Sequence, residues 1–272
     1  MLGGFLYFAY NLDSMSPRPP SGKGRPDRRR PTSLGPHQQR RRLQGEQPSP
    51  RKGGEHDPLH LSDEITKELR STARPGKGDL LVKVFADAAG AYVDDDFDEA
   101  IRLGEQAKHM ALRALAPREL LGLAYYQAGR WQEAARELSA FRRLSGTTEQ
   151  NAVLADCYRA QGKPARAVEL CDEVRADAVS PGVYYEANIV AAGALADQGR
   201  IDEAIARLEA LELRPEVAEE HHLRAWYVLA DLLEKKGRFT QSTEWFEAVA
   251  AADPDVTDAP QRARRARPEP PA

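Results

Sequence analysis

The sequence predicts an all-α fold, an α-solenoid of about five helical hairpins with a leading capping helix and a disordered tail at each end. Three observations predict it. Apolar residues recur at helical spacing between residues 81 and 253. One hairpin-like stretch occurs five times in this part of the chain. The same part is dominated by Ala, Leu, Glu and Arg, which favour helices, and it shows no strand-like alternation of useful length.

The first 58 residues are expected to form a disordered basic arm. Residues 16–58 are rich in Pro, Gly, Arg and Gln, so they cannot bury enough apolar surface to offset the entropy of ordering. Residues 1–53 carry eleven Lys or Arg against three Asp or Glu, a charge of +8, and the net charge of −3 leaves −11 for the rest. We expect Met15 to be the translation start, because residues 1–14 differ in composition from residues 16–58 and lack the features of a signal peptide.

A short capping helix is predicted within residues 59–80. Ser62 or Asp63 can cap its N-terminus, and acidic residues fill its first turn. Pro75 and Gly76 end it. We expect this helix to cover the exposed face of the first hairpin, because terminal repeats need a cap.

The clearest hairpin is "LLGLAYYQAGRWQEAARELSAF", residues 120–141. Leu121 and Tyr125 lie on one face of a first helix, together with the small Gly122. Gly129 can adopt the left-handed conformation that ends a helix. Trp131 opens a second helix, and an alanine three residues later allows the two helices to approach closely. The stretch therefore predicts an antiparallel helical hairpin.

The hairpin recurs along residues 81–253 at intervals of 34, 33, 37 and 38 residues. The intervals are measured between turn residues, with an aspartate in place of glycine in the first, degenerate copy. These turn residues are Asp95, Gly129, Gly162, Gly199 and Gly237. Intervals this regular predict consecutive hairpins whose apolar flanks stack on one another.

The last residues, 254–272, are expected to be a disordered tail. Their sequence, "PDVTDAPQRARRARPEPPA", is rich in Pro and charge and has almost no large apolar side chain. This is the same composition that predicts disorder in the arm.

The repeated residues resemble the tetratricopeptide repeat, a helix–turn–helix unit of 34 residues. The resemblance covers residues 81–254, and "LGLAYYQAGRWQEAARELSAF" carries it most clearly, followed by "AAGALADQGRIDEAIARL" and "LADLLEKKGRFTQSTEWF". The order of a basic arm, a short helix and divergent repeats is similar to an uncharacterised bacterial family of such proteins. The resemblance implies a cytoplasmic protein that binds a partner protein.

The resemblance also implies a concave groove, lined by first-helix positions that are not used for packing. Acids outnumber bases there, which would suit a peptide bearing Lys or Arg. The Lys, Arg and Asn clamp with which some family members grip a C-terminal carboxylate is absent. The candidate groove residues are Glu119, Leu123, Tyr126, Asp156, Arg159, Tyr227, Asp231 and Glu234.

Enzymatic, cofactor and metal-binding motifs are not evident in the sequence. It has no dinucleotide or phosphate loop, no nucleophile elbow and no HExxH. The acidic run Asp94–Glu99 lacks the glycine and distant glutamate of a calcium loop, so we expect a solvated turn that favours the next helix. His221 and His222 point in different directions on a helix and are expected to be a surface cap or turn. Cys157 and Cys171 are expected to fill the core.

We therefore expect a non-enzymatic scaffold that binds a peptide or helix in the groove, with no cofactor or metal and no membrane partner. The alternative is a nucleic-acid-associated protein whose arm makes weak, non-specific contacts while the repeats recruit another protein. A third interpretation places the positive arm on the negative body, where it occludes the groove. The candidate polyanion-binding residues of the arm are Arg28, Arg29, Arg30, Arg40, Arg41 and Arg42.

Overall fold

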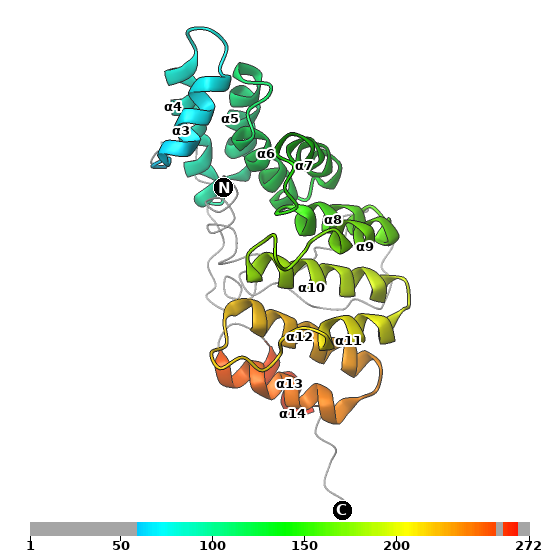
Figure 1. The fold of residues 1–272 in the computed structure, drawn as a ribbon. Coiled ribbons are helices and arrows are strands. Elements are labelled where there is room, and N and C mark those ends of the chain that lie inside the picture. The colour runs from blue at the N-terminus through cyan, green and yellow to red at the C-terminus, as the bar shows by residue number, and fades with distance from the viewer. Residues whose placement is uncertain (1–58, 254–257, 266–272) are drawn as a thin grey trace, which may run out of the picture. The chain divides into compact units, whose positions relative to one another are not determined.

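The structure, a computed structural model, describes residues 59–253 and 258–265 (Figure 1). Within these residues every regular element is a helix. The predictions made for the arm, including its disorder, its start at Met15 and its two arginine triplets, lie outside the described residues. Among the described residues, none of the helices combines the length and the apolar character needed to cross a membrane.

Two compact units divide the described chain, and their boundary falls between Gln161 and Gly162. The first unit contains α3 (Asp63–Thr72), α4 (Gly78–Val93), α5 (Phe97–Met110), α6 (Ala116–Gln127), α7 (Trp131–Ser145) and α8 (Asn151–Ala160). The second unit contains α9 (Pro164–Asp172), α10 (Pro181–Asp197), α11 (Ile201–Glu209), α12 (Glu220–Lys235), α13 (Phe239–Ala252) and α14 (Ala259–Arg265).

Helix α3 is the leading helix that the sequence predicts within residues 59–80. The hydroxyl of Ser62, rather than Asp63, caps it by accepting a hydrogen bond from the Ile65 N–H at 3.3 Å. Its buried side chains, Ile65 and Leu69, pack it against the unit. Glu68 accepts a hydrogen bond of 2.7 Å from the backbone N–H of Leu115. The helix is thus tied to the start of α6 as well as covering the first hairpin.

Five turns join α4 to α5, α6 to α7, α8 to α9, α10 to α11 and α12 to α13, as the repeat spacing predicts. The glycines at the last four turns have φ between 72° and 81°, and Asp95 at the first has φ 61°. At four turns the next residue donates its N–H back to a carbonyl five positions earlier, which closes the first helix. These bonds are Asp96 to Ala91, Arg130 to Tyr125, Arg200 to Leu195 and Arg238 to Leu233, at 2.8–3.0 Å.

Small residues set how closely the helices of a pair approach. A Cβ added at Gly122 of α6 would lie 2.4 Å from a methyl carbon of Leu138 on α7. Ala134 on α7 is also completely buried. The sequence interpretation that small residues permit close contact within a hairpin is therefore confirmed.

The second unit has two adjoining apolar clusters. One gathers residues of α10, α11 and α12 around Leu195, Ile205 and Leu229. The other gathers Trp226 of α12, Phe246 and Val249 of α13, and Ala259 and Ala263 of α14.

Helix α14 corrects the prediction that residues 254–272 are disordered throughout. Residues 259–265 are helical, and Ala259 and Ala263 are buried one turn apart. The composition is misleading because the face that packs consists of two small residues flanking Arg262. A segment without large apolar side chains can still pack when the large apolar side chains come from other helices, here Trp226, Phe246 and Val249.

Candidate functional site

Three of the candidate groove residues meet in the first unit. The hydroxyl of Tyr126, on α6, donates a hydrogen bond of 2.7 Å to Asp156 of α8. Arg159, one turn further along α8, donates to the other oxygen of Asp156 at 2.8 Å. Tyr126 and Asp156 are 6% and 4% exposed. These side chains of two successive first helices therefore lie together in the structure.

Glu119 and Leu123 lie on α6 beside this group and are 2% and 0% exposed. The carboxylate of Glu119 accepts a hydrogen bond of 2.7 Å from the side-chain amide of Gln150. Burial raises the pKa of Glu119 to about 8, which the Gln150 hydrogen bond opposes and the charge of Glu149 reinforces. These positions were expected not to be used for packing, and the structure differs, because Glu119, Leu123, Tyr126 and Asp156 are buried. Their contact with a peptide stays a prediction.

The other three candidates surround an arginine in the second unit. Tyr227, Asp231 and Glu234 are half-buried on α12, one turn apart from one another. Arg262 of α14 donates to Asp231 at 2.9 Å and also to Glu234. Its other terminal nitrogen lies 3.4 Å from the hydroxyl of Tyr227. We call Tyr227, Asp231, Glu234 and Phe246 the arginine site.

Two aromatic rings complete the arginine site. The guanidinium carbon of Arg262 lies 4.3 Å from the ring centroid of Phe246 and 5.7 Å from that of Tyr227. Both distances are within the range of cation–π attraction. The Tyr227 hydroxyl donates at 2.7 Å to Asp258, just before α14. The site thus presents two carboxylates and two ring faces to one planar cation.

The electrostatics of the arginine site keep Arg262 charged. Burial alone would lower the pKa of Arg262, but hydrogen bonds to Glu234, Tyr227 and Asp231 raise it overall. Burial raises the pKa of Tyr227, and its hydrogen bond to Asp258 raises it further. The phenol therefore stays neutral and is held as a hydrogen-bond donor.

Sequence reasoning missed Arg262, Asp258 and Phe246. The two alanines, Ala259 and Ala263, stand at helical spacing around Arg262, and this signal could have indicated a short helix there, although not the contacts of Arg262. The high density of proline and charge in the surrounding tail obscured it.

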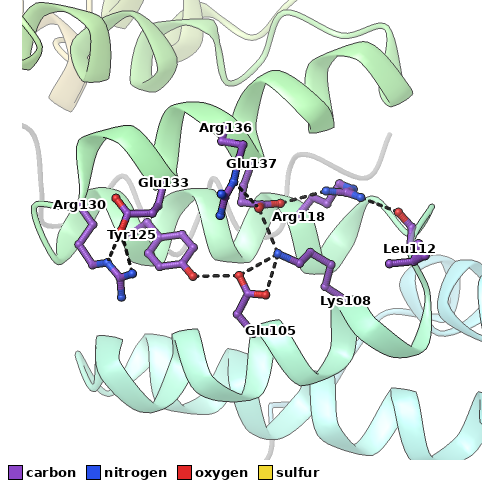
Figure 2. A network of polar contacts seen from close by, with 9 residues as sticks. All are labelled: Glu105, Lys108, Leu112, Arg118, Tyr125, Arg130, Glu133, Arg136 and Glu137. Carbon is purple, nitrogen blue, oxygen red and sulfur yellow. Dashed lines mark hydrogen bonds and ion pairs between the residues drawn. The ribbon is translucent and has the colours of Figure 1, made fainter.

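A second polar network, shown in Figure 2, joins α5, α6 and α7. Glu137 of α7 accepts from Lys108 of α5 at 3.1 Å and from Arg118 of α6 at 3.0 Å. Glu105 accepts from Lys108 and from the hydroxyl of Tyr125, at 2.8 and 2.9 Å. Burial alone would raise the pKa of Glu105, but the Lys108 and Tyr125 hydrogen bonds lower it overall. The network thus links the first hairpin to the second through pairs of opposite charges.

The remaining motifs are structural. Asp96, within the acidic run, caps α5 by accepting from the Glu99 N–H at 3.2 Å, as expected of a turn that favours the next helix. The Nδ1 of His222 accepts from the Glu219 N–H at 3.0 Å, which confirms the cap but not its exposure, since His222 is buried. Cys157 and Cys171 are both buried, and burial raises the pKa of the Cys157 thiol.

Two family models, both of tetratricopeptide repeats, match the chain. One matches residues 119–181 and 190–257, and the other matches residues 158–216. Together they cover residues 119–257, just over half of the chain. The search of curated proteins found no match.

Solved structures with the same fold include TTC0263, a thermophilic tetratricopeptide repeat protein of Thermus thermophilus. It is 19% identical, with a TM-score of 0.52, over 68% of this chain and 98% of that chain. The nearly identical TPR-like repeats of Podosopora anserina are 23% identical, with a TM-score of 0.50, over 70% of this chain and 96% of that one. The helix pairs, the turn geometry and the family models agree: the chain belongs to the tetratricopeptide repeat family.

Proposed function

We propose that this protein is a non-enzymatic scaffold that binds a partner protein through an arginine-bearing peptide or helix. Tetratricopeptide repeats commonly mediate protein–protein interaction and are generally non-enzymatic. The observation that supports the finer proposal is the arginine site, in which Tyr227, Asp231 and Glu234 hold a guanidinium group.

The chemistry of the arginine site favours arginine over lysine. A planar guanidinium can donate to two carboxylates at once and still lie against a ring, whereas an ammonium group is a compact, strongly hydrated charge. Half-burial of Asp231 and Glu234 reduces screening by water, so their attraction for a cation is greater than on an open surface.

The first unit also pairs an arginine with a carboxylate on a first helix. A tyrosine hydroxyl from one first helix and an arginine meet at a carboxylate on the next first helix, in the group Tyr126, Asp156 and Arg159. Asp156 and Asp231 occupy the same position of the repeat, six residues before the turn glycine, and each accepts from an arginine. This supports the view that an acid at this first-helix position binds an arginine side chain.

Affinity purification of the full-length chain from its native cells tests the proposal. The variant Asp231→Asn/Glu234→Gln removes both carboxylates of the arginine site without changing side-chain size. The control, Glu216→Gln/Glu244→Gln, removes two exposed acids of the same unit. We expect the first variant to recover the bound protein at least about tenfold less well, because charge-assisted hydrogen bonds are lost, and the control to recover it normally.

Cross-linking of the recovered complex identifies the segment that binds. The proposal requires an arginine in that segment, cross-linked beside α12. Equal recovery by the two double variants, or a bound segment without arginine, would contradict it.

A further inference from the structure

We propose that α14 is an intramolecular ligand of the arginine site, which a basic helical segment of a partner displaces by presenting the same residues. This role rests on the proposed function, and it makes α14 the segment that a partner must replace in the arginine site. The pattern that the site accepts is a small residue, an arginine three positions later and a second small residue next to it, as in Ala259, Arg262 and Ala263.

The contacts of α14 are concentrated on these three side chains. Ala259 and Ala263 are 0% and 6% exposed and pack in the cluster of Trp226, Phe246 and Val249. Between them, Arg262 reaches the two carboxylates of α12. Neighbouring Arg264 is exposed. Recognition is therefore performed by one face of a single helical turn.

The attachment of α14 differs from that of the repeat helices. Helix α13 buries Phe246 and Val249, whereas the buried apolar residues of α14 among its described side chains are Ala259 and Ala263, whose methyl groups remove little apolar surface from water. A seven-residue helix is also marginal by itself, so its helicity depends on docking. Arg262 consequently provides most of the specificity of this contact, and α14 is suited to exchange.

The short chain segment between α13 and α14 favours binding of α14 over binding of a separate peptide. Few residues separate Ala252 at the end of α13 from Ala259, so the effective concentration of α14 at the site is high. A ligand in trans binds with an apparent affinity equal to its intrinsic affinity multiplied by the fraction of molecules whose site is free. A variant that weakens α14 should therefore bind such a ligand more tightly.

The test uses full-length protein and a fluorescent peptide with the sequence of residues 254–272. The protein variants are Arg262→Ala and, as a matched control on the same helix, Arg264→Ala. Fluorescence anisotropy should show the Arg262→Ala protein binding the peptide at least about tenfold more tightly than wild type, with the Arg264→Ala protein unchanged. A peptide carrying Arg262→Ala should lose this binding, and one carrying Arg264→Ala should keep it.

Folding is checked by the far-ultraviolet circular dichroism of each variant. An Arg262→Lys protein provides a second, milder release of α14, with an affinity for the peptide between those of wild type and Arg262→Ala. If the Arg262→Ala protein binds no more tightly than wild type, or if the Arg262→Ala peptide binds equally well, the inference is overturned.

The outcomes also separate this inference from the proposed function. Suppose that the Asp231→Asn/Glu234→Gln variant loses the partner but the Arg262→Ala variant binds the peptide no more tightly. The proposed function would then stand, and the role of α14 would be overturned. The reverse pair of results would support α14 as a ligand of the site and place the partner elsewhere.

Discussion

Lys108 of α5 donates a hydrogen bond of 3.1 Å to Glu137 of α7, although 29 residues separate them in the sequence (Figure 2). Arg118 of α6 reaches the other oxygen of the same carboxylate, so one acid joins three helices. Glu137 is only 3% exposed. An ionised carboxylate this deeply buried is stabilised when cations and hydrogen-bond donors replace the water that it has lost.

Replacing Glu137 by alanine should therefore destabilise the first unit strongly. The change leaves Lys108 and Arg118, which are 14% and 18% exposed, without their common partner. We expect a loss of about 3–5 kcal/mol in the free energy of unfolding, measured by urea denaturation. The matched control is Glu133→Ala on the same helix, because Glu133 pairs with Arg130 near the surface and should cost about 1 kcal/mol or less. Equal losses for the two variants would contradict the prediction.

Glu119 should make the stability of the protein fall as the pH rises. Burial raises the pKa of this carboxyl to about 8 in the folded protein, against an ordinary value of 4.5, so the folded state keeps a proton that the unfolded state releases. Its contribution to stability is fully present below pH 4.5 and is lost as the pH rises through 8. The slope should approach about 1.4 kcal/mol per pH unit between these values.

The Glu119→Gln variant tests this dependence, because the amide cannot ionise and can still accept from Gln150. We expect the difference in unfolding free energy between the variant and wild type to grow from about pH 5 to about pH 8 and then level off. A difference that does not change with pH would mean that Glu119 ionises normally in the folded protein.

The sequence predicts the features of this fold that depend on neighbouring residues, and it misses those that depend on distant ones. The left-handed turn requires glycine or a tolerant residue such as Asp95, so the hairpins can be counted from the chain alone. The arginine site instead needs Arg262 to meet Asp231, 31 positions earlier. Spacing places Asp231 on the correct helix, but nothing local indicates which cation lies beside it.

The burial of the first-helix positions was missed for the same reason. Tyr126 and Asp156, 30 residues apart, lie together on successive first helices. Family geometry assigns such positions to an open groove. In this chain, polar side chains at these positions hydrogen-bond to one another, as Glu119 and Gln150 also do. Whether a position is buried in this way depends on which residues face each other across the helices.

Gly122 should be intolerant of even a methyl group. A Cβ at this position would lie 2.4 and 2.5 Å from two side-chain carbons of Leu138, so α6 and α7 would have to separate or Leu138 would have to leave its rotamer. We expect Gly122→Ala to lower the free energy of unfolding by about 1–3 kcal/mol. Thermal unfolding should be compared with that of Gly182→Ala on α10, where an added Cβ meets nothing within 4 Å and the change should be neutral or slightly stabilising.

The N-terminal cap of α12 should be lost when His222 is replaced by alanine and restored when it is replaced by glutamine. The Nδ1 of His222 accepts a hydrogen bond of 3.0 Å from the backbone N–H of Glu219, a donor that the helix itself cannot satisfy. His222→Ala should cost about 1 kcal/mol in unfolding free energy, whereas His222→Gln should recover most of it, because glutamine can accept the same bond from this position. The His222 ring also packs against Tyr185, with 5.0 Å between the ring centroids. Hydrogen exchange of the Glu219 amide distinguishes loss of the cap from loss of this ring packing. If the alanine and glutamine variants are equally destabilised while this amide stays protected, the ring contact rather than the cap accounts for the role of His222.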